Sequence, residues 1–266
     1  RQICDLELIL NGSFSPLDGF MGEKDYESVL ENMRLNDGTL SPIPITLDIT
    51  EEFAKTIKDN NKITLRDKEG FPLAILTISD LWRPNINEEA KIVYKTNDIT
   101  HPGVHYLKQM SNEYYLGGTL IGIQLPHHYD YINLRHTPNE IKSIFKNKKW
   151  EKIVGFQTRN PLHRAHIQMT INASNDLNSK LLLHPVVGMT KPGDIDHHTR
   201  VRCYKYAMEK YPKDLAILSL LPLAMRMAGP RETLWHALIR KNYGCTHLIV
   251  GRDHAGPGKD KNGNAF

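Results

Sequence analysis

The chain has 266 residues, which is enough for one large hydrophobic core or two modest ones, so one or two domains are expected. Its 40% hydrophobic and 24% charged residues are ordinary for a globular protein, and no apolar run approaches the length of a membrane-spanning helix, so no membrane partner is expected. The net charge of +4 suits anionic small molecules but is too small to indicate binding of nucleic acid.

The first half of the sequence predicts two short helices followed by several strands. Ile3, Leu6 and Leu10 share one face of an opening helix, and a second helix is expected around residues 26–33. Residues 67–70 have the composition of a hairpin turn. Several short strands without long helices between them predict a small β-barrel. The expected strands are residues 43–49, 63–66, 73–78 and 92–94.

From about residue 126 the pattern changes to strands and helices in alternation. Thr137 to Glu140 form a capping box with Pro138 at the first helical position, so a helix is expected to run to about residue 146. Further strands are expected at residues 153–156, 181–187, 216–221 and 248–250. Helices are expected to begin near Asn160–Pro161, after His198 and at Gly229–Pro230. The fold class is therefore mixed α/β, with a β-rich domain at residues 1–129 and a parallel-sheet domain at residues 130–266.

Ligands of open α/β sheets bind at the carboxyl ends of the strands, and two such ends carry polar, cationic loops. The first loop, residues 157–166, reads QTRNPLHRAH. Arg159 offers a planar set of donors suited to phosphate or sulfate, and Asn160 is expected to cap the following helix. His163 and His166 are three residues apart at the positive end of that helix.

The second loop, residues 251–258, reads GRDHAGPG. Its glycines allow close approach of the backbone to a ligand, and Arg252 and His254 add positive or pH-dependent charge. A single such loop is usually a surface turn. Two cationic loops at one edge of a sheet instead predict a site for an anion or a nucleotide.

Other readings of these residues are weaker. His163 and His166 lack the glutamate of a zinc-protease helix. His197–His198, just after Asp194 and Asp196, is better explained by Asp196 or its neighbours capping a helix that begins near Thr199, so no metal ligands are expected. P-loop, dinucleotide-fingerprint and serine-hydrolase motifs are absent from the sequence. The scattered Cys4, Cys203 and Cys245 suggest buried thiols in a reducing, cytoplasmic location.

Four strings in this order resemble the ATP sulfurylase family in its fungal and bacterial form: QTRNPLHRAH, HPVVGMTKPGDIDHHTR, LSLLPLAMRMAGPRE and GRDHAGPG. The opening RQICDLELILNGSFSPLDGFM resembles the start of the same family. The resemblance covers nearly the whole chain. It implies an N-terminal PUA-like β-barrel at residues 1–129 and a Rossmann-like nucleotidyltransferase domain from residue 130.

The resemblance also implies an activity and residue roles. Sulfate would attack the α-phosphorus of ATP in line, giving adenylyl sulfate and pyrophosphate in the first step of sulfate assimilation. Gln157, Arg159 and the backbone of Ala255 would hold sulfate. ATP would be held by residues 157–160 and by Gly251, Arg252, Asp253 and His254. Thr158, Arg159 and Asn160 would be catalytic, and His163 and His166 would stabilise the transition state.

Mg²⁺ bound to ATP is the expected cofactor, ATP and sulfate are the expected small-molecule partners, and a homo-oligomer is implied, a hexamer for the fungal type. Both ends of the chain look cut. The tail at residues 259–266 is expected neither to complete a sheet nor to cover a triphosphate, so activity of this chain alone should be low. Three alternatives remain open: an adenylyltransferase for a phosphorylated small molecule, an RNA-binding protein and a non-catalytic regulatory relative.

Overall fold

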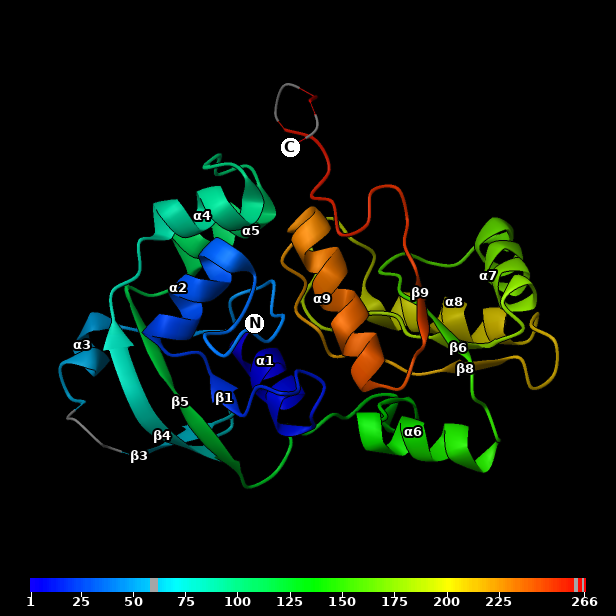
Figure 1. The fold of residues 1–266 in the computed structure, drawn as a ribbon, viewed down its shortest axis with the longest axis horizontal. Coiled ribbons are helices and arrows are strands. Elements are labelled where there is room, and N and C mark those ends of the chain that lie inside the picture. Colours follow the sequence, from blue (N-terminus) through cyan, green and yellow to red (C-terminus); the bar gives the residue numbers. More distant parts are fainter. Residues whose placement is uncertain (58–61, 261–262, 265) are drawn as a thin grey trace.

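The computed structural model describes residues 1–57, 62–260, 263–264 and 266. The chain forms two adjoining bodies, one built on an antiparallel sheet and the other on a parallel sheet (Figure 1). The expectation about the tail at residues 259–266 falls partly on residues 261, 262 and 265, which lie outside the described residues.

The first body contains five strands in the order β1-β5-β4-β3, with β2 also paired to β5. All of these pairs are antiparallel, and within the described residues the sheet stays open rather than closing into a barrel. The expected hairpin turn joins β3 to β4, where the Gly70 N–H donates to the Asp67 carbonyl at 3.1 Å. The elements are α1 (Gln2–Leu10), β1 (Gly19–Phe20), α2 (Glu23–Asn32), β2 (Leu47–Ile49), α3 (Glu51–Ala54), β3 (Lys62–Arg66), β4 (Pro72–Trp82), α4 (Ile86–Tyr94), α5 (Pro102–His105), the π-helical turn η1 (Tyr106–Met110) and β5 (Tyr114–Gly122).

Two sequence-based expectations for this body are corrected. Residues 92–94 are not a strand but the end of helix α4. The Asn85 side chain caps this helix by accepting the Glu88 N–H at 3.2 Å. The buried Ala90, Val93 and Tyr94 then follow helical spacing. The strand expected at residues 43–49 is confined to β2.

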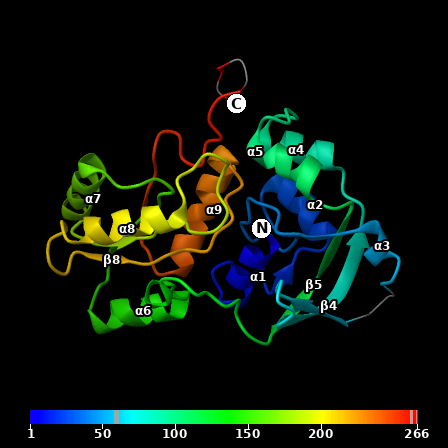
Figure 2. The same cartoon turned by 180° about the vertical axis from the view of Figure 1, so that it is seen from behind.

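The second body has four parallel strands in the order β8-β7-β6-β9. Helix α8 lies on one face of this sheet and α9 on the other, as the two opposite views show (Figures 1 and 2). The expected capping box is present at the start of α6, with Thr137 and Glu140 each bonding the other's backbone. The elements are the 3₁₀ turn η2 (Ile132–Leu134), α6 (Pro138–Asn147), β6 (Ile153–Phe156), α7 (Arg164–Asp176), β7 (Lys180–Leu183), α8 (His197–Met208), β8 (Ala216–Leu218), α9 (Gly229–Asn242) and β9 (His247–Ile249).

The start of helix α7 differs from the expectation. The helix begins at Arg164 with His163 as its N-cap, not near Asn160 and Pro161. The backbone of Asn160 is instead held in a turn, since its N–H donates to the Thr158 hydroxyl and its carbonyl accepts the Tyr204 hydroxyl, both at 3.0 Å. The strands expected at 181–187 and 216–221 are shorter than predicted, and only the isolated bridge Val186–Leu221 continues their pairing.

The two bodies share one hydrophobic core. The rings of Phe14, in the turn after α1, and Trp235 of α9 lie 5.0 Å apart, and Tyr243 is fully buried in the same cluster. A buried ion pair crosses the same boundary, from Asp5 of α1 to Arg226 before α9. Cores of this kind resist relative movement of domains, so the parallel sheet is held at a fixed position against the first body. In the described part of the chain, no helix is both long and apolar enough to cross a membrane.

Candidate functional site

The two predicted loops leave neighbouring strands of the parallel sheet. Strands β6 and β9 pair with Phe156 opposite Ile249, so the chain leaves both at the same edge. From β6 the chain proceeds outward to β7 and β8, and then returns to place β9 on the other side of β6. The loops therefore flank the point where strand order reverses, which is where open parallel sheets bind ligands.

Residues 157–160 form a tight turn directly after β6. Gln157 and Thr158 are buried, and the Thr158 hydroxyl both donates to the Asn160 carbonyl and accepts the Asn160 N–H, each at 3.0 Å. Gln157 Oε1 is a buried oxygen without a hydrogen-bond partner, while its Nε2 touches the sulfur of Met225 at 4.0 Å. An unsatisfied amide is costly in a core, so Gln157 is a group suited to a polar ligand.

Arg159 is engaged with a carboxylate. Its Nη1 donates to Asp194 Oδ1 at 2.5 Å, and their side chains are 17% and 7% exposed. Asp194 comes from the loop between β7 and α8, so a third strand end contributes to this edge of the sheet. The second oxygen of Asp194 is buried and has no partner. Arg159 therefore binds a carboxylate of the chain itself, and its expected role toward phosphate or sulfate stays a prediction.

His163 and His166 lie face to face at the start of α7. Their ring centroids are 3.8 Å apart with an interplanar angle of 28°. Burial, and to a lesser extent His163, lowers the pKa of His166, and His166 Nδ1 is buried without a partner. The two side chains are thus together, as predicted, although His163 is the N-cap rather than a helical residue.

The second loop presents Gly251, Arg252 and Asp253 to solvent and buries Ala255. His254 is half-buried, and its Nε2 lies 3.0 Å from Nδ1 of the fully buried His236. Burial lowers the pKa of His254 to about 4, so this imidazole is neutral near pH 7. His254 therefore adds no positive charge to the loop near pH 7, and the expected roles of Arg252 and His254 stay predictions.

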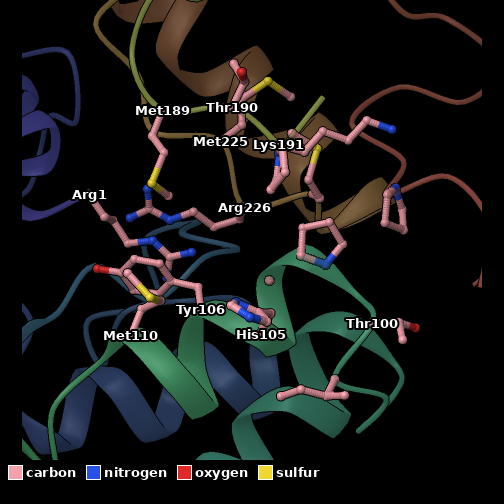
Figure 3. Close-up of a pocket in the computed structure, with 16 residues that line it drawn as sticks. Arg1, Thr100, His105, Tyr106, Met110, Met189, Thr190, Lys191, Met225 and Arg226 are labelled. Atoms are coloured by element: carbon pink, nitrogen blue, oxygen red, sulfur yellow. The ribbon is translucent and has the colours of Figure 1, made fainter. Parts of the chain in front are cut away.

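A cavity of about 900 Å³ lies between the segments that follow β7 and β8 and the first body (Figure 3). Its wall includes Met189 and Lys191 after β7, Met225 after β8 and Pro257 after β9, with Tyr106 across the cavity. The volume is within the range of small-molecule sites. The predicted residues 157–166 and 251–255 do not line this cavity; Gln157 reaches its wall only through the contact with Met225.

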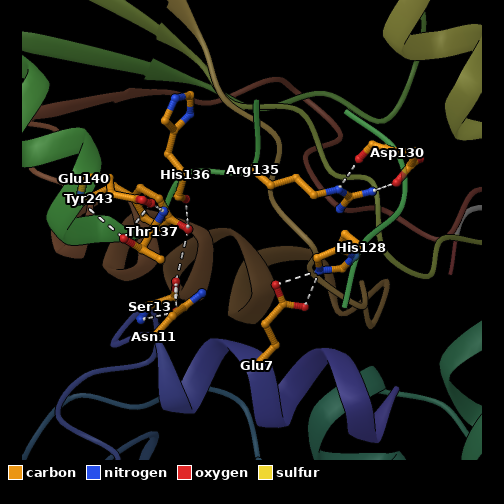
Figure 4. A network of polar contacts seen from close by, with 10 residues as sticks. All are labelled: Glu7, Asn11, Ser13, His128, Asp130, Arg135, His136, Thr137, Glu140 and Tyr243. Carbon is orange, nitrogen blue, oxygen red and sulfur yellow. Dashed lines mark hydrogen bonds and ion pairs between the residues drawn. The ribbon is translucent and has the colours of Figure 1, made fainter. Parts of the chain in front are cut away.

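A polar network surrounds the connection between the two bodies (Figure 4). His128 Nε2 lies 2.8 Å from Glu7 Oε1, and Arg135 donates to Asp130 Oδ1 at 2.6 Å. Asp130 Oδ2 also lies 2.7 Å from His197 Nε2 and 3.6 Å from His198 Nδ1.

Asp130, His197 and His198 each offer a ligand atom within 4.8 Å of the others, so the set could hold a metal ion. Arg135 and His197 each lie within ion-pair distance of this carboxylate. As predicted, Asp196 caps α8, with its carboxylate accepting the Thr199 N–H at 2.9 Å. The expected lack of metal ligands stays a prediction.

Sequence reasoning missed three side chains at this edge: Asp194, Tyr204 and His236. Asp194 and Tyr204 reach the turn at residues 159–160 only through the tertiary fold, so no local pattern identifies them. His236 carries a weak signal, because it lies four residues after Glu232 on α9 and therefore on the same helical face.

The fold and this edge define a class: a two-domain protein whose parallel sheet carries two polar loops, with Arg159 and Arg252, at its reversal point. The profile of the ATP-sulfurylase family matches residues 132–266, and that of the PUA-like domain matches residues 1–125. The chain belongs to the ATP-sulfurylase family, and its mixed α/β fold class with a leading PUA-like domain is confirmed.

Individual relatives agree with this assignment. The chain is 56% identical over 266 residues to sulfate adenylyltransferase of Saccharomyces cerevisiae, covering all of this chain and 52% of that protein. It is 53% identical over 268 residues to the Schizosaccharomyces pombe enzyme of the same name, covering all of this chain and 55% of that protein. The chain thus spans about half the length of these relatives.

The solved structure of a hexameric APS kinase from Thiobacillus denitrificans is also similar, with a TM-score of 0.79 and 32% identity. The match covers 95% of this chain and 46% of that chain. The match therefore extends over both bodies of the present structure.

Proposed function

We propose that this chain carries the substrate sites of a sulfate adenylyltransferase, which joins sulfate to the α-phosphate of ATP and releases pyrophosphate. The observation that carries the proposal is the contact of Arg159 with the Asp194 carboxylate at the reversal point of the sheet, two residues after the buried, unpaired side-chain oxygen of Gln157. The similarity to the sulfate adenylyltransferases of Saccharomyces cerevisiae and Schizosaccharomyces pombe supports the same reaction.

Sulfate is a weak nucleophile and a dianion at neutral pH, so it needs no general base but must approach a triphosphate. Cations and N–H donors in a dry site reduce that repulsion. We assign Gln157, Arg159 and the Ala255 backbone to sulfate. We assign residues 157–160, Gly251, Arg252, Asp253 and His254 to ATP.

The residues around the triphosphate then have distinct tasks. Arg159 and Asn160 act on the reacting phosphate, and Thr158 shapes their turn, since its hydroxyl donates one hydrogen bond and accepts another within it. His163 and His166 stabilise charge along the phosphates, with the start of α7 behind them. Positioning and electrostatics would then supply the rate.

Mg²⁺ enters this scheme with ATP as part of the substrate. Asp194 is paired with Arg159, and Asp196 caps α8, which leaves Asp253 as the remaining carboxylate of the three loops. A cation that keeps several waters and binds chiefly phosphate oxygens suits such a surrounding. The metal would neutralise phosphate charge, while the chain's own residues hold and orient the two anions.

The experiment is a pyrophosphate-release assay with ATP, with and without sulfate. The proposal predicts release that depends on sulfate, accepts selenate in its place and is inhibited by perchlorate, because the site recognises tetrahedral oxygen geometry. Nitrate, which is planar, should inhibit less than perchlorate. Release that ignores sulfate but requires a phosphorylated acceptor would instead favour the alternative adenylyltransferase.

We further propose a cytoplasmic homo-oligomer. The free state of Cys4, Cys203 and Cys245 supports a reducing location, and the structurally similar APS kinase from Thiobacillus denitrificans is hexameric. Light scattering would give the mass of the assembly, and a monomer at micromolar concentration would contradict this proposal.

A further inference from the structure

A tyrosine of helix α8 holds the turn that follows β6. Tyr204 is fully buried, and its hydroxyl donates to the Asn160 carbonyl at 3.0 Å. Burial raises the pKa of Tyr204 to about 12, so the hydroxyl keeps its hydrogen near neutral pH. The Thr158 hydroxyl donates to the same carbonyl oxygen, also at 3.0 Å. Both lone pairs of that oxygen are therefore occupied by hydroxyl groups.

These two bonds keep helix α7 from starting where its sequence favours a start. Asn160 followed by Pro161 is a common combination of N-cap and first helical residue. In such a helix the Asn160 carbonyl would accept the N–H of Arg164, four residues further on. That carbonyl is already occupied, and α7 begins at Arg164 with His163 as its N-cap. Residues 160–163 therefore stay outside the helix.

The same face of α8 holds the loop that carries Asp194. Arg200 lies four residues before Tyr204, and hence one turn away on the same side of the helix. Arg200 is buried, and its Nε donates at 2.8 Å to the carbonyl of Ile195, the residue after Asp194. One face of α8 therefore holds the backbone on both sides of the contact between Arg159 and Asp194.

We propose that Tyr204 is a positioning residue of the reaction, whose hydroxyl holds the Asn160 carbonyl outside helix α7 and so keeps Arg159 in contact with Asp194. The inference rests on the proposed function, which places sulfate and the reacting phosphate at Arg159. Tyr204 acts through the turn at residues 158–160 rather than on the substrates. Such a role matters because a small displacement of a positioned group lowers the rate of a reaction strongly.

The first test is hydrogen exchange of the Arg164 amide, measured by NMR, and it needs no turnover. In the unmodified protein this amide should exchange without protection, since the first N–H groups of a helix lack a helical acceptor. Tyr204→Phe frees one lone pair of the Asn160 carbonyl, so α7 should extend and exchange at Arg164 should slow at least about tenfold. A variant that is only destabilised would exchange faster. A protected Arg164 amide in the unmodified protein, or unchanged or faster exchange in the variant, would overturn the inference.

The second test is turnover, measured as sulfate-dependent release of pyrophosphate. We expect Tyr204→Phe to lower kcat at least about tenfold and to keep the KM for ATP within about threefold, because a displaced Arg159 affects the reacting groups more than ground-state binding. Two tyrosines are controls: Tyr206 of α8 is exposed, and Tyr211 is buried with its hydroxyl 2.8 Å from that of Thr170. Tyr206→Phe and Tyr211→Phe should each keep kcat within about twofold. An equal loss in Tyr211→Phe would show a general effect of losing a buried hydroxyl and would contradict the proposal.

A rescue experiment separates position from stability. Adding Arg164→Pro to Tyr204→Phe removes the N–H that would extend α7, and proline suits the first position of the observed helix. The preceding His163 is already extended, with φ −123° and ψ 171°, as a residue before proline requires. The double variant should regain a kcat within about threefold of that of Arg164→Pro alone, and no regain would overturn the inference. Absence of sulfate-dependent release from the unmodified protein would reject the proposed function, whereas the exchange at Arg164 decides whether Tyr204 holds the turn.

Discussion

Arg159 donates a hydrogen bond to a carboxylate of its own chain, and this contact favours an arginine over a lysine at the position. The guanidinium can keep one N–H on Asp194 while its other donors remain available to a second anion, whereas an ammonium is a compact point charge. The pairing also limits the positions that Arg159 can adopt. A preorganised donor of this kind is worth most where charge develops during a reaction.

We expect Arg159→Lys to lower turnover at least about a hundredfold with the fold intact, since loss of one preorganised donor typically costs about 3 kcal/mol of barrier. Steady-state pyrophosphate release gives the rate, and circular dichroism reports the fold. Arg164→Lys is the matched control, because Arg164 is exposed at the start of α7. A fully active Arg159→Lys variant would remove Arg159 from the site.

His166 allows a different kind of test at the same scale. Its buried, unpaired Nδ1 and its place at the start of α7 suit an interaction with phosphate. We expect His166→Ala to lower turnover much more than ATP affinity, which is typical of a contact strongest in the transition state. Gln168→Ala, an exposed position on the same helix, should change neither. Unchanged turnover with strongly weakened ATP binding would show ground-state anchoring instead.

At the scale of elements, β5 shows why some of the fold could not be predicted. It is the central strand of the first sheet, yet Gly117, Gly118 and Gly122 lower its apparent strand propensity. The structure gives the reason for a glycine at 118. A Cβ there would lie 2.1 Å from the Thr77 carbonyl oxygen, and φ is +155°. The packing of neighbouring backbones thus overrides local preference.

Gly118→Ala should therefore lower the free energy of unfolding by at least about 3 kcal/mol, because the clash is with backbone that cannot move aside. Gly122→Ala is the control in the same strand, since its new Cβ would meet only the flexible Leu10 side chain at 3.2 Å, and it should cost less than about 1 kcal/mol. Urea denaturation measures both values. Equal costs would contradict the packing account.

In the second body, too, local sequence patterns predict some features, whereas others depend on contacts that form only in the folded chain. The order of strands and helices in the second body, the capping box at Thr137 and the placement of both cationic loops at one edge follow from sequence patterns. The start of α7 does not, because Tyr204, 44 residues further on, holds the Asn160 carbonyl and delays the helix. Asp194 and His236 likewise reach their partners only after folding.

For the whole molecule, buried neutral histidines govern the response to acid. Burial lowers the pKa of His101 to about 4 and that of His184 well below its ordinary value. Both nitrogens of His184 are buried without a partner, and His101 Nδ1 accepts the Gly103 N–H at 3.0 Å. In each case the folded state resists protonation that the unfolded chain accepts.

Stability should therefore be full above the ordinary histidine pKa of about 6.5 and should fall as the pH drops from there towards 4. Each unit by which a pKa is lowered corresponds to about 1.4 kcal/mol per histidine. Urea midpoints measured between pH 7.5 and 4.5 test this. His184→Met, which cannot be protonated, should give a shallower decline, and a profile as steep as that of the unmodified chain would contradict the assignment to His184.

The two bodies share one core. The expected domain boundary between residues 129 and 130 lies in the stretch between the two matched profiles, so it stays a prediction.

The central claim concerns the reaction proposed for the reversal point of the parallel sheet, the attack of sulfate on the α-phosphorus of ATP. Sulfate labelled with oxygen-18 at all four positions tests it most directly, with mass spectrometry of the nucleotide product and of the released pyrophosphate. Attack of sulfate on the α-phosphorus predicts a product that keeps all four labelled oxygens and pyrophosphate that carries none. Label in pyrophosphate, or a nucleotide product without sulfate, would contradict the account.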